Sequence, residues 1–231
     1  MQRERNRHAK FVLLSKLDAL EHVVGCRISP NDRICILPVC CRETSVKDEL
    51  SFEKYFNSEG SKGDCYKSIL VKNGATANLV YFFNYFNEKL LDRPEELLDC
   101  DILLLPGGRM EFGIAHLLNS KLLDCIFRFK GTVICFSAGG MMLFDEYLIT
   151  PNKVYHELAV KTGLGLLDSS SFLIDVHYVE DDELQTQAIE TICKSEKKSV
   201  YAITQEGYVV IRDNKILEMD GVFEFSSSNY N

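Results

Sequence analysis

Ser137 lies where a serine hydroxyl could act as a nucleophile. It follows the apolar run GTVICF (131–136) and precedes AGG and a predicted helix. A sharp turn from a strand into a helix exposes the hydroxyl and places it beside backbone N–H groups that can stabilise an oxyanion. The residue two positions earlier must be small, and here it is Cys135 rather than glycine. Judged on this turn alone, a serine that merely caps a helix is the commoner case.

A serine nucleophile needs a base, and His177 is the best placed of the five histidines. It directly follows FLIDV (172–176), so it lies at the end of a predicted strand, where it could face a site at the edge of a sheet. His156, the nearest alternative, lies in a polar segment. We therefore predict His177 as the general base.

An acidic side chain would orient the imidazole and balance its charge. Four acids compete for this role: Asp145, Asp168, Asp175 and Glu206. Asp175 shares a strand face with His177, but neighbours two residues apart stand side by side, which makes contact with a ring nitrogen awkward. Glu206 comes from a separate strand end and has a longer side chain. We predict Glu206 as the third member of a triad and keep Asp175 as the alternative.

A second turn, Pro106-Gly107-Gly108, follows the apolar run DILLLP (101–106). Two glycines allow the backbone to turn tightly and to point N–H groups at an anion, although an ordinary turn at a strand end fits equally well. The glycine-rich patterns of dinucleotide-binding and P-loop proteins are absent here, so neither kind of cofactor is predicted.

Strand-like and helix-like segments alternate along most of the chain, which predicts an α/β fold with a doubly wound, mostly parallel sheet and helices on both faces. Short antiparallel strands are predicted near the C-terminus. The predicted strands are 10–15, 33–39, 101–106, 131–136, 172–176, 200–204, 207–211 and 222–225. The predicted helices include 46–57, 111–130, the segment MMLFDEYL (141–148) and 181–195, while 57–64 is predicted as a loop.

Composition narrows the functional classes. The 231 residues carry 26 basic and 34 acidic side chains, a net charge of −8 that disfavours nucleic-acid binding. No apolar run is long enough to cross a membrane, and no secretory signal is recognisable. The nine cysteines include no C-x-x-C pair, which favours a reduced, cytoplasmic chain without a metal site. We predict one domain over 1–231, with flexible tails at 1–9 and 226–231.

The segments LLLPGG, VICFSAGG, GLGLLDSSSFLIDVHY and VYAITQEGYVVI occur in the order found in the peptidase E (aspartyl dipeptidase) and cyanophycinase family of serine hydrolases. The chain resembles this family over roughly 10–218. The resemblance implies a fold similar to that of class I glutamine amidotransferases. It also implies Ser137 as nucleophile, His177 as base, Glu206 as the acid, and Gly108 and Ala138 as donors to the oxyanion, with no cofactor.

The sequence departs from the family where the substrate would bind. Arg109 follows the glycine pair where relatives usually have asparagine, and it is the predicted partner of a substrate carboxylate. The acidic run at 180–183 would repel an anion if it lined the mouth of the site, although a solvated helix start is the commoner case for such a run. On these grounds we expect strict N-terminal aspartyl specificity to be lost or weakened.

Three hypotheses follow from these observations. The preferred one is a serine-type peptidase that cleaves a short peptide or related amide through an acyl-enzyme. The others are an inactive binding or scaffold protein on the same fold and a cysteine-dependent enzyme similar to an amidotransferase. The physiological substrate and the oligomeric state, monomer or homodimer, stay open at this level.

Overall fold

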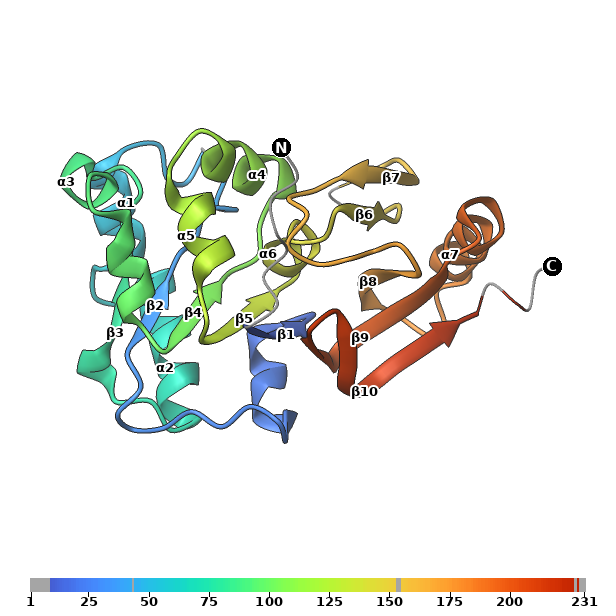
Figure 1. Cartoon of the computed structure of the whole chain (residues 1–231), viewed down its shortest axis with the longest axis horizontal. Helices are drawn as coiled ribbons and strands as arrows, with labels where there is room; N and C mark the ends of the chain where they lie inside the picture. The colour runs from blue at the N-terminus through green and yellow to red at the C-terminus, as the bar shows by residue number, and fades with distance from the viewer. Residues whose placement is uncertain (1–8, 43, 153–154, 227, 229–231) are drawn as a thin grey trace.

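The computed structural model describes residues 9–42, 44–152, 155–226 and 228. Within them, eight strands form one sheet, crossed in the order β10-β9-β1-β5-β4-β2-β3, with β8 paired to β9 beside this path (Figure 1). The strands of the sheet are β1 (Lys10–Leu14), β2 (Ile34–Ile36), β3 (Val80–Phe82), β4 (Ile102–Leu105), β5 (Thr132–Phe136), β8 (Phe172–Tyr178), β9 (Ser199–Arg212) and β10 (Lys215–Phe225).

Helices pack around the parallel half of this sheet. Strands β1, β5, β4, β2 and β3 pair in parallel, and every residue of β4 is buried, as expected for a strand covered on both faces. The α-helices are α1 (Glu49–Phe56), α2 (Lys62–Lys72), α3 (Glu88–Leu91), α4 (Met110–Leu118), α5 (Leu122–Arg128), α6 (Ala138–Met141) and α7 (Glu183–Glu196). Short 3-10 helices are η1 (Leu17–His22), η2 (Ala77–Leu79) and η3 (Pro94–Asp99). The predicted α/β fold with a mostly parallel sheet is confirmed.

The long strand β9 joins the two halves of the sheet. Its C-terminal part, from Tyr208 to Arg212, pairs antiparallel with β1, while its N-terminal part, from Ser199 to Thr204, pairs in parallel with β8. Because β1 and β8 pair with different stretches of β9 and run in opposite directions, their C-terminal ends approach each other beside Gln205 and the two residues that follow it. The edge strand β10 completes a long hairpin with β9 that extends away from α1 to α6, with α7 beside it (Figure 1).

Several predicted boundaries are wrong. The segment 141–148 does not continue as a helix: α6 ends at Met141, and β6 (Glu146–Ile149) pairs with β7 (Ala159–Thr162) in a separate antiparallel sheet. The two short strands predicted at 200–204 and 207–211 are one continuous strand, β9. The predicted loop at 57–64 ends early because the Ser61 side chain accepts a hydrogen bond from the backbone of Asp64 and caps α2.

The structure also bears on the predicted tails, the cysteines and the expected absence of a membrane-spanning helix. Of the predicted tails, 1–8, 227 and 229–231 lie outside the described residues, whereas Ala9 is fully buried. All nine cysteines are free thiols. In the part of the chain that the structure describes, no helix is both long and apolar enough to span a bilayer.

Candidate active site

Ser137 occupies a strained turn between β5 and α6. Its backbone has φ 52° and ψ −129°, a combination that non-glycine residues rarely adopt. The turn is fixed on both sides: the N–H of Ser137 donates to the carbonyl of Leu14 at 2.9 Å, and its carbonyl accepts from Gly140 and Met141. Strain of this kind costs about 1–3 kcal/mol and concentrates at functional sites. The predicted turn that exposes a serine is therefore present.

The Gly107-Gly108 turn lies directly against Ser137. A Cβ atom on Gly107 would stand 2.9 Å from the Cβ of Ser137, and one on Gly108 would stand 1.9 Å from the carbonyl oxygen of Cys40. Gly108 also has φ 156°, so only glycine fits there without strain. Among the described residues, the N–H groups of Gly108 and Ala138 have no hydrogen-bond partner. Both are therefore free to donate to a bound anion.

His177 faces Ser137. The distance from its Nε2 to the Oγ of Ser137 is 2.9 Å, and the distance from its Nδ1 to the Oε1 of Gln205 is 3.2 Å. With the Nδ1–H donating to Gln205, the Nε2 lone pair accepts the proton of the serine hydroxyl. His177 has φ 63° and lies at a bulge, where the register of β8 on β9 shifts between Val176 and Tyr178.

The structure does not bring Glu206 to His177. Successive residues of a strand point to opposite faces, so Gln205 faces the imidazole while Glu206 is exposed to solvent. The predicted position of the third group is therefore wrong by one residue, and the group that occupies it is a neutral amide. Gln205 directly precedes Glu206 in the segment VYAITQEGYVVI.

Asp175 does not contact His177 either. It is buried and accepts hydrogen bonds from Thr150 Oγ1 at 3.0 Å and from Gln185 Nε2 at 2.9 Å. Burial raises its pKa from 3.8 to about 7, against the effect of these bonds. It thus anchors β8 to its neighbours. The other candidates lie elsewhere too: Asp145 bonds to Ser169 and His156 is exposed.

The surroundings of His177 keep its imidazole neutral. Burial lowers its pKa below the ordinary 6.5, the hydrogen bond that His177 donates to Gln205 opposes this shift, and the positive charge of Lys16 adds to it. A buried imidazole without a neighbouring carboxylate holds a proton poorly. Near neutral pH, His177 is thus unprotonated and able to take the proton of Ser137.

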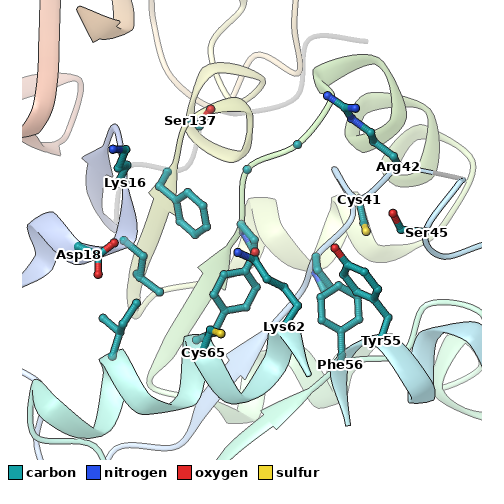
Figure 2. Close-up of a pocket in the computed structure, with 18 of the residues that line it drawn as sticks. Lys16, Asp18, Cys41, Arg42, Ser45, Tyr55, Phe56, Lys62, Cys65 and Ser137 are labelled. Atoms are coloured by element: carbon teal, nitrogen blue, oxygen red, sulfur yellow. The ribbon is translucent and has the colours of Figure 1, made fainter. Parts of the chain in front are cut away.

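A cavity of about 620 Å³ opens in front of Ser137 and His177, and it is called here the Ser137 cavity. Aromatic rings from Tyr55, Phe56, Tyr66 and Phe136 form part of its wall. Figure 2 shows Lys16 and Asp18 at one side, Arg42 and Ser45 at the other, and Lys62 and Cys65 projecting from α2 below Ser137.

The charges in the Ser137 cavity are mostly positive. Among the described residues that line it, Lys16, Arg42 and Lys62 are cationic and Asp18 is the acid. The whole chain has the opposite balance, with a net charge of −8. A basic cavity in an acidic protein favours a substrate that carries negative charge. The sequence analysis missed these three cations, which come from separate segments.

Arg109 is not one of the residues that line this cavity. Its Nε lies 3.7 Å from Glu111 Oε2, and its guanidinium stacks on the ring of Tyr155 at 5.1 Å. The acidic run at 180–183 also lies outside: its residues are exposed, and Asp182 caps α7 by accepting from Gln185. Arg109, the predicted partner of a substrate carboxylate, therefore lies outside this cavity, and the acidic run is the solvated helix start that the sequence favours.

Three thiols near Ser137, those of Cys135, Cys40 and Cys41, are poorly suited to act as nucleophiles. Cys135 and Cys40 are fully buried, and burial raises the pKa of each far above the ordinary 9. Cys41 lines the Ser137 cavity, but burial raises its pKa as well. The reactive form of cysteine is the thiolate, so these surroundings favour the serine over a cysteine. Among the described residues, no group of three or more potential ligands could hold a metal ion.

Comparisons with known proteins agree with this fold. No protein-family model matches the chain. Cobyric acid synthase from Thermoanaerobacter sp. (strain X514) is 27% identical over 129 residues, which are 53% of this chain but 24% of that protein. The chain thus spans about a quarter of the length of that curated relative.

Two solved structures match most of the chain. A protein from Listeria monocytogenes EGD-e named for peptidase E has a TM-score of 0.59 at 16% identity, covering 94% of this chain and 99% of that one. A peptidase from an acI-B1 Actinobacterium has a TM-score of 0.56 at 13% identity, with 90% and 85% coverage. The chain therefore has the peptidase E-like fold that the sequence predicts. At these identities the likeness establishes the fold alone.

Proposed function

We propose that the chain is a serine-type hydrolase that cleaves a peptide bond or a related amide. The observation that carries this proposal is the 2.9 Å contact between His177 Nε2 and the Oγ of a serine held in a strained turn. A helix cap needs neither a histidine partner nor this backbone conformation. The peptidase names of both similar structures point to the same chemistry.

The reaction would follow the general scheme of serine hydrolases. Ser137 Oγ attacks the carbonyl carbon while His177 Nε2 takes its proton, and the N–H groups of Gly108 and Ala138 stabilise the oxyanion. The imidazolium then gives its proton to the leaving amine, which departs and leaves an acyl-enzyme on Ser137. A water molecule, deprotonated by His177 in turn, hydrolyses that ester and restores the enzyme.

Gln205 would perform one of the two functions of a triad carboxylate: it would orient the imidazole but would not balance its charge. By accepting from the Nδ1–H it fixes the tautomer that leaves Nε2 free, over a distance of 3.2 Å. It carries no charge, so it does not balance the imidazolium that forms during attack. We therefore infer that the chain hydrolyses amides more slowly than an enzyme with a complete acidic triad.

The substrate we propose is a short peptide with a carboxylate near the scissile bond. Lys16, Arg42 and Lys62 supply the positive charges that such a group needs. This replaces the expectation of a weakened preference for acidic residues, which depended on Arg109 and on the acidic run. An acidic peptide also agrees with the aspartyl specificity that the family resemblance implies.

A fluorophosphonate probe tests the hydrolase proposal. We expect it to label Ser137 in the folded protein, with the modified residue located by peptide mass spectrometry. The Ser137→Ala variant should give no labelling, and His177→Gln should slow it strongly, since the base is then missing. Labelling of another residue, or none in folded wild-type protein, would overturn the proposal.

Paired peptides test the substrate class. We expect Asp-X peptides to be cleaved faster than Asn-X peptides of the same length. Arg42→Gln and Lys62→Gln should each reduce this preference by about tenfold, the usual size of one lost charged hydrogen bond. Arg109→Gln is the matched control, because its side chain lies outside the Ser137 cavity, and it should change the preference less than about twofold.

An inactive binding protein is the second candidate, and the neutral Gln205 is the observation that favours it. Such a protein would keep the basic Ser137 cavity and bind anionic peptides without cleaving them. Calorimetry with an Asp-X peptide would then show binding to a folded protein whose Ser137 is not labelled by the probe.

A further inference from the structure

Ser15 is a fully buried polar residue at the end of β1, and its hydroxyl bridges two other strands. The hydroxyl donates to the carbonyl of Ile203 on β9 at 2.9 Å. It also accepts from the backbone N–H of His177 on β8, again at 2.9 Å. The three residues therefore meet where the ends of β1 and β8 converge on β9.

The position of this hydroxyl coincides with the bulge at His177. Strand β8 pairs Val176 with Ile203 and then Tyr178 with Thr204, so His177 is an extra residue without a partner in the ladder. Its N–H would lack a strand partner at this point. Ser15 gives both that N–H and the Ile203 carbonyl a partner, because one hydroxyl can donate and accept at the same time.

The bulge in turn decides where the imidazole points. A bulge re-aims the side chain of the extra residue, whereas a regular strand alternates its side chains between the two faces. With φ 63°, His177 directs Nε2 at Ser137. Extended backbone at the same residue would turn the ring in another direction.

The same strand end also holds the nucleophile. Leu14, the neighbour of Ser15, accepts the N–H of Ser137 through its carbonyl. Leu14, the last residue of β1, and the adjacent Ser15 thus fix the backbones of Ser137, which follows β5, and of His177 in β8. Their relative position is set by this strand.

We propose that Ser15 is a positioning residue whose hydroxyl maintains the bulge that aims His177 at Ser137. It acts through His177 and takes no part in the chemical steps. The inference rests on the proposed function only in treating His177 as the base, because the backbone geometry itself is independent of any activity.

Three variants of Ser15 and one matched control test this role. Ser15→Ala removes the hydroxyl. Ser15→Thr keeps it, and Ser15→Val has the shape of threonine without it, so this pair isolates the hydroxyl even if the alanine variant does not fold. Ser169→Ala is the control, since Ser169 is equally buried, accepts from the backbone of Glu146 at 3.1 Å and bonds to Asp145 away from the site.

Two measurements separate positioning from simple stabilisation. The first is an NMR titration of the His177 imidazole. We expect its midpoint to rise toward the ordinary 6.5 in Ser15→Ala and Ser15→Val, as the ring leaves its buried place, and to stay low in Ser15→Thr and Ser169→Ala. The second is the split between kcat and KM on an Asp-X peptide. We expect kcat to fall by about 10²-fold without the hydroxyl, with KM changed little.

The proposal is overturned if Ser15→Ala and Ser15→Val leave the His177 midpoint as in the wild type and lower stability no more than Ser169→Ala does. Ser15 would then be an ordinary buried hydroxyl. If wild-type protein neither cleaves peptides nor reacts with the fluorophosphonate, the proposed function fails, while the titration still reports on Ser15.

Discussion

Ser137 and His177 both have a positive φ, but the two turns are held by different parts of the chain. The turn at Ser137 depends partly on its own neighbours, since its carbonyl accepts from residues three and four positions later, while its N–H donates to the distant Leu14. The bulge at His177 depends on Ser15, 162 residues away in the sequence, and its ring is oriented by Gln205, 28 residues away. One half of the site is therefore partly local, whereas the other is assembled from distant strands.

This difference has a practical consequence for understanding the site. A change near Ser137 alters the nucleophile through sequence neighbours, and its effect can be anticipated from a short motif. A change that alters the aim of His177 can come from any strand that meets at β9, including residues that never approach a substrate. Variants of the residues around His177 therefore test the half of the site that sequence neighbours do not determine.

The largest effect is expected at Gln205. Gln205→Leu removes the acceptor for Nδ1–H, so the ring loses both its tautomer and its orientation, and kcat/KM should fall by about 10²- to 10³-fold. Glu206→Gln should change it less than about twofold, because that side chain is exposed. The measurement is steady-state kinetics on an Asp-X peptide. The opposite ranking would return Glu206 to the role that the sequence predicts.

An intermediate effect is expected at Asp175, which anchors β8 before the bulge. Its pKa is raised from 3.8 to about 7 by burial, so the folded state prefers the protonated acid. The stability it contributes is complete below about pH 3.8 and is lost as the pH rises through about 7. Between pH 5 and pH 7 this loss is about 2 kcal/mol.

The Asp175→Asn variant isolates that contribution, because the amide stays neutral at every pH. The free energy of unfolding in urea, measured at pH 5 and at pH 7, should fall less over this interval in the variant than in the wild type. Equal changes in the two proteins would mean that Asp175 does not titrate in this range.

The smallest effect is a shift in the pH profile. The base must be unprotonated, and the pKa of His177 is lowered by burial, so the acid limb of kcat/KM should lie below pH 6.5. Gln205→Glu places a carboxylate beside the imidazolium and should move the limb upward by about one unit. Lys16→Gln should move it in the same direction by less. A limb that stays in place in Gln205→Glu would contradict the assignment of His177.

Part of the site could be predicted from the sequence. A buried strand, a serine and small residues in a row indicate the turn at Ser137, although this turn alone fits a helix cap better and the resemblance to a family is needed to assign a nucleophile. An apolar run followed by histidine indicates the strand end at His177. Both signals lie within a few residues of the group they place. The alternation of strands and helices likewise identifies the parallel sheet.

The partner of His177 and the cations of the Ser137 cavity depend on strand register and on contacts between distant segments. The sequence favours Glu206 over Asp175 for its separate strand end and longer side chain, and Gln205 is not among the candidates considered there. The alternation of β9 places Gln205 toward the ring, and counting in twos from Ile203 reaches it. Lys16, Arg42 and Lys62 come from three separate segments that meet only in the folded chain. No spacing in the sequence indicates that these three residues line one cavity.

The dependence of His177 on the end of β1 also has a consequence for the order in which the site forms. β1 precedes the other strands of the sheet in the chain, but Leu14 and the adjacent Ser15 reach their partners only once β5, β8 and β9 are in place. Contacts between residues so far apart in sequence form late, because closing long loops is slow. During synthesis the chain carries its serine long before it carries an aimed base. Ser137 and His177 are thus aligned only after β9 has paired with both β1 and β8.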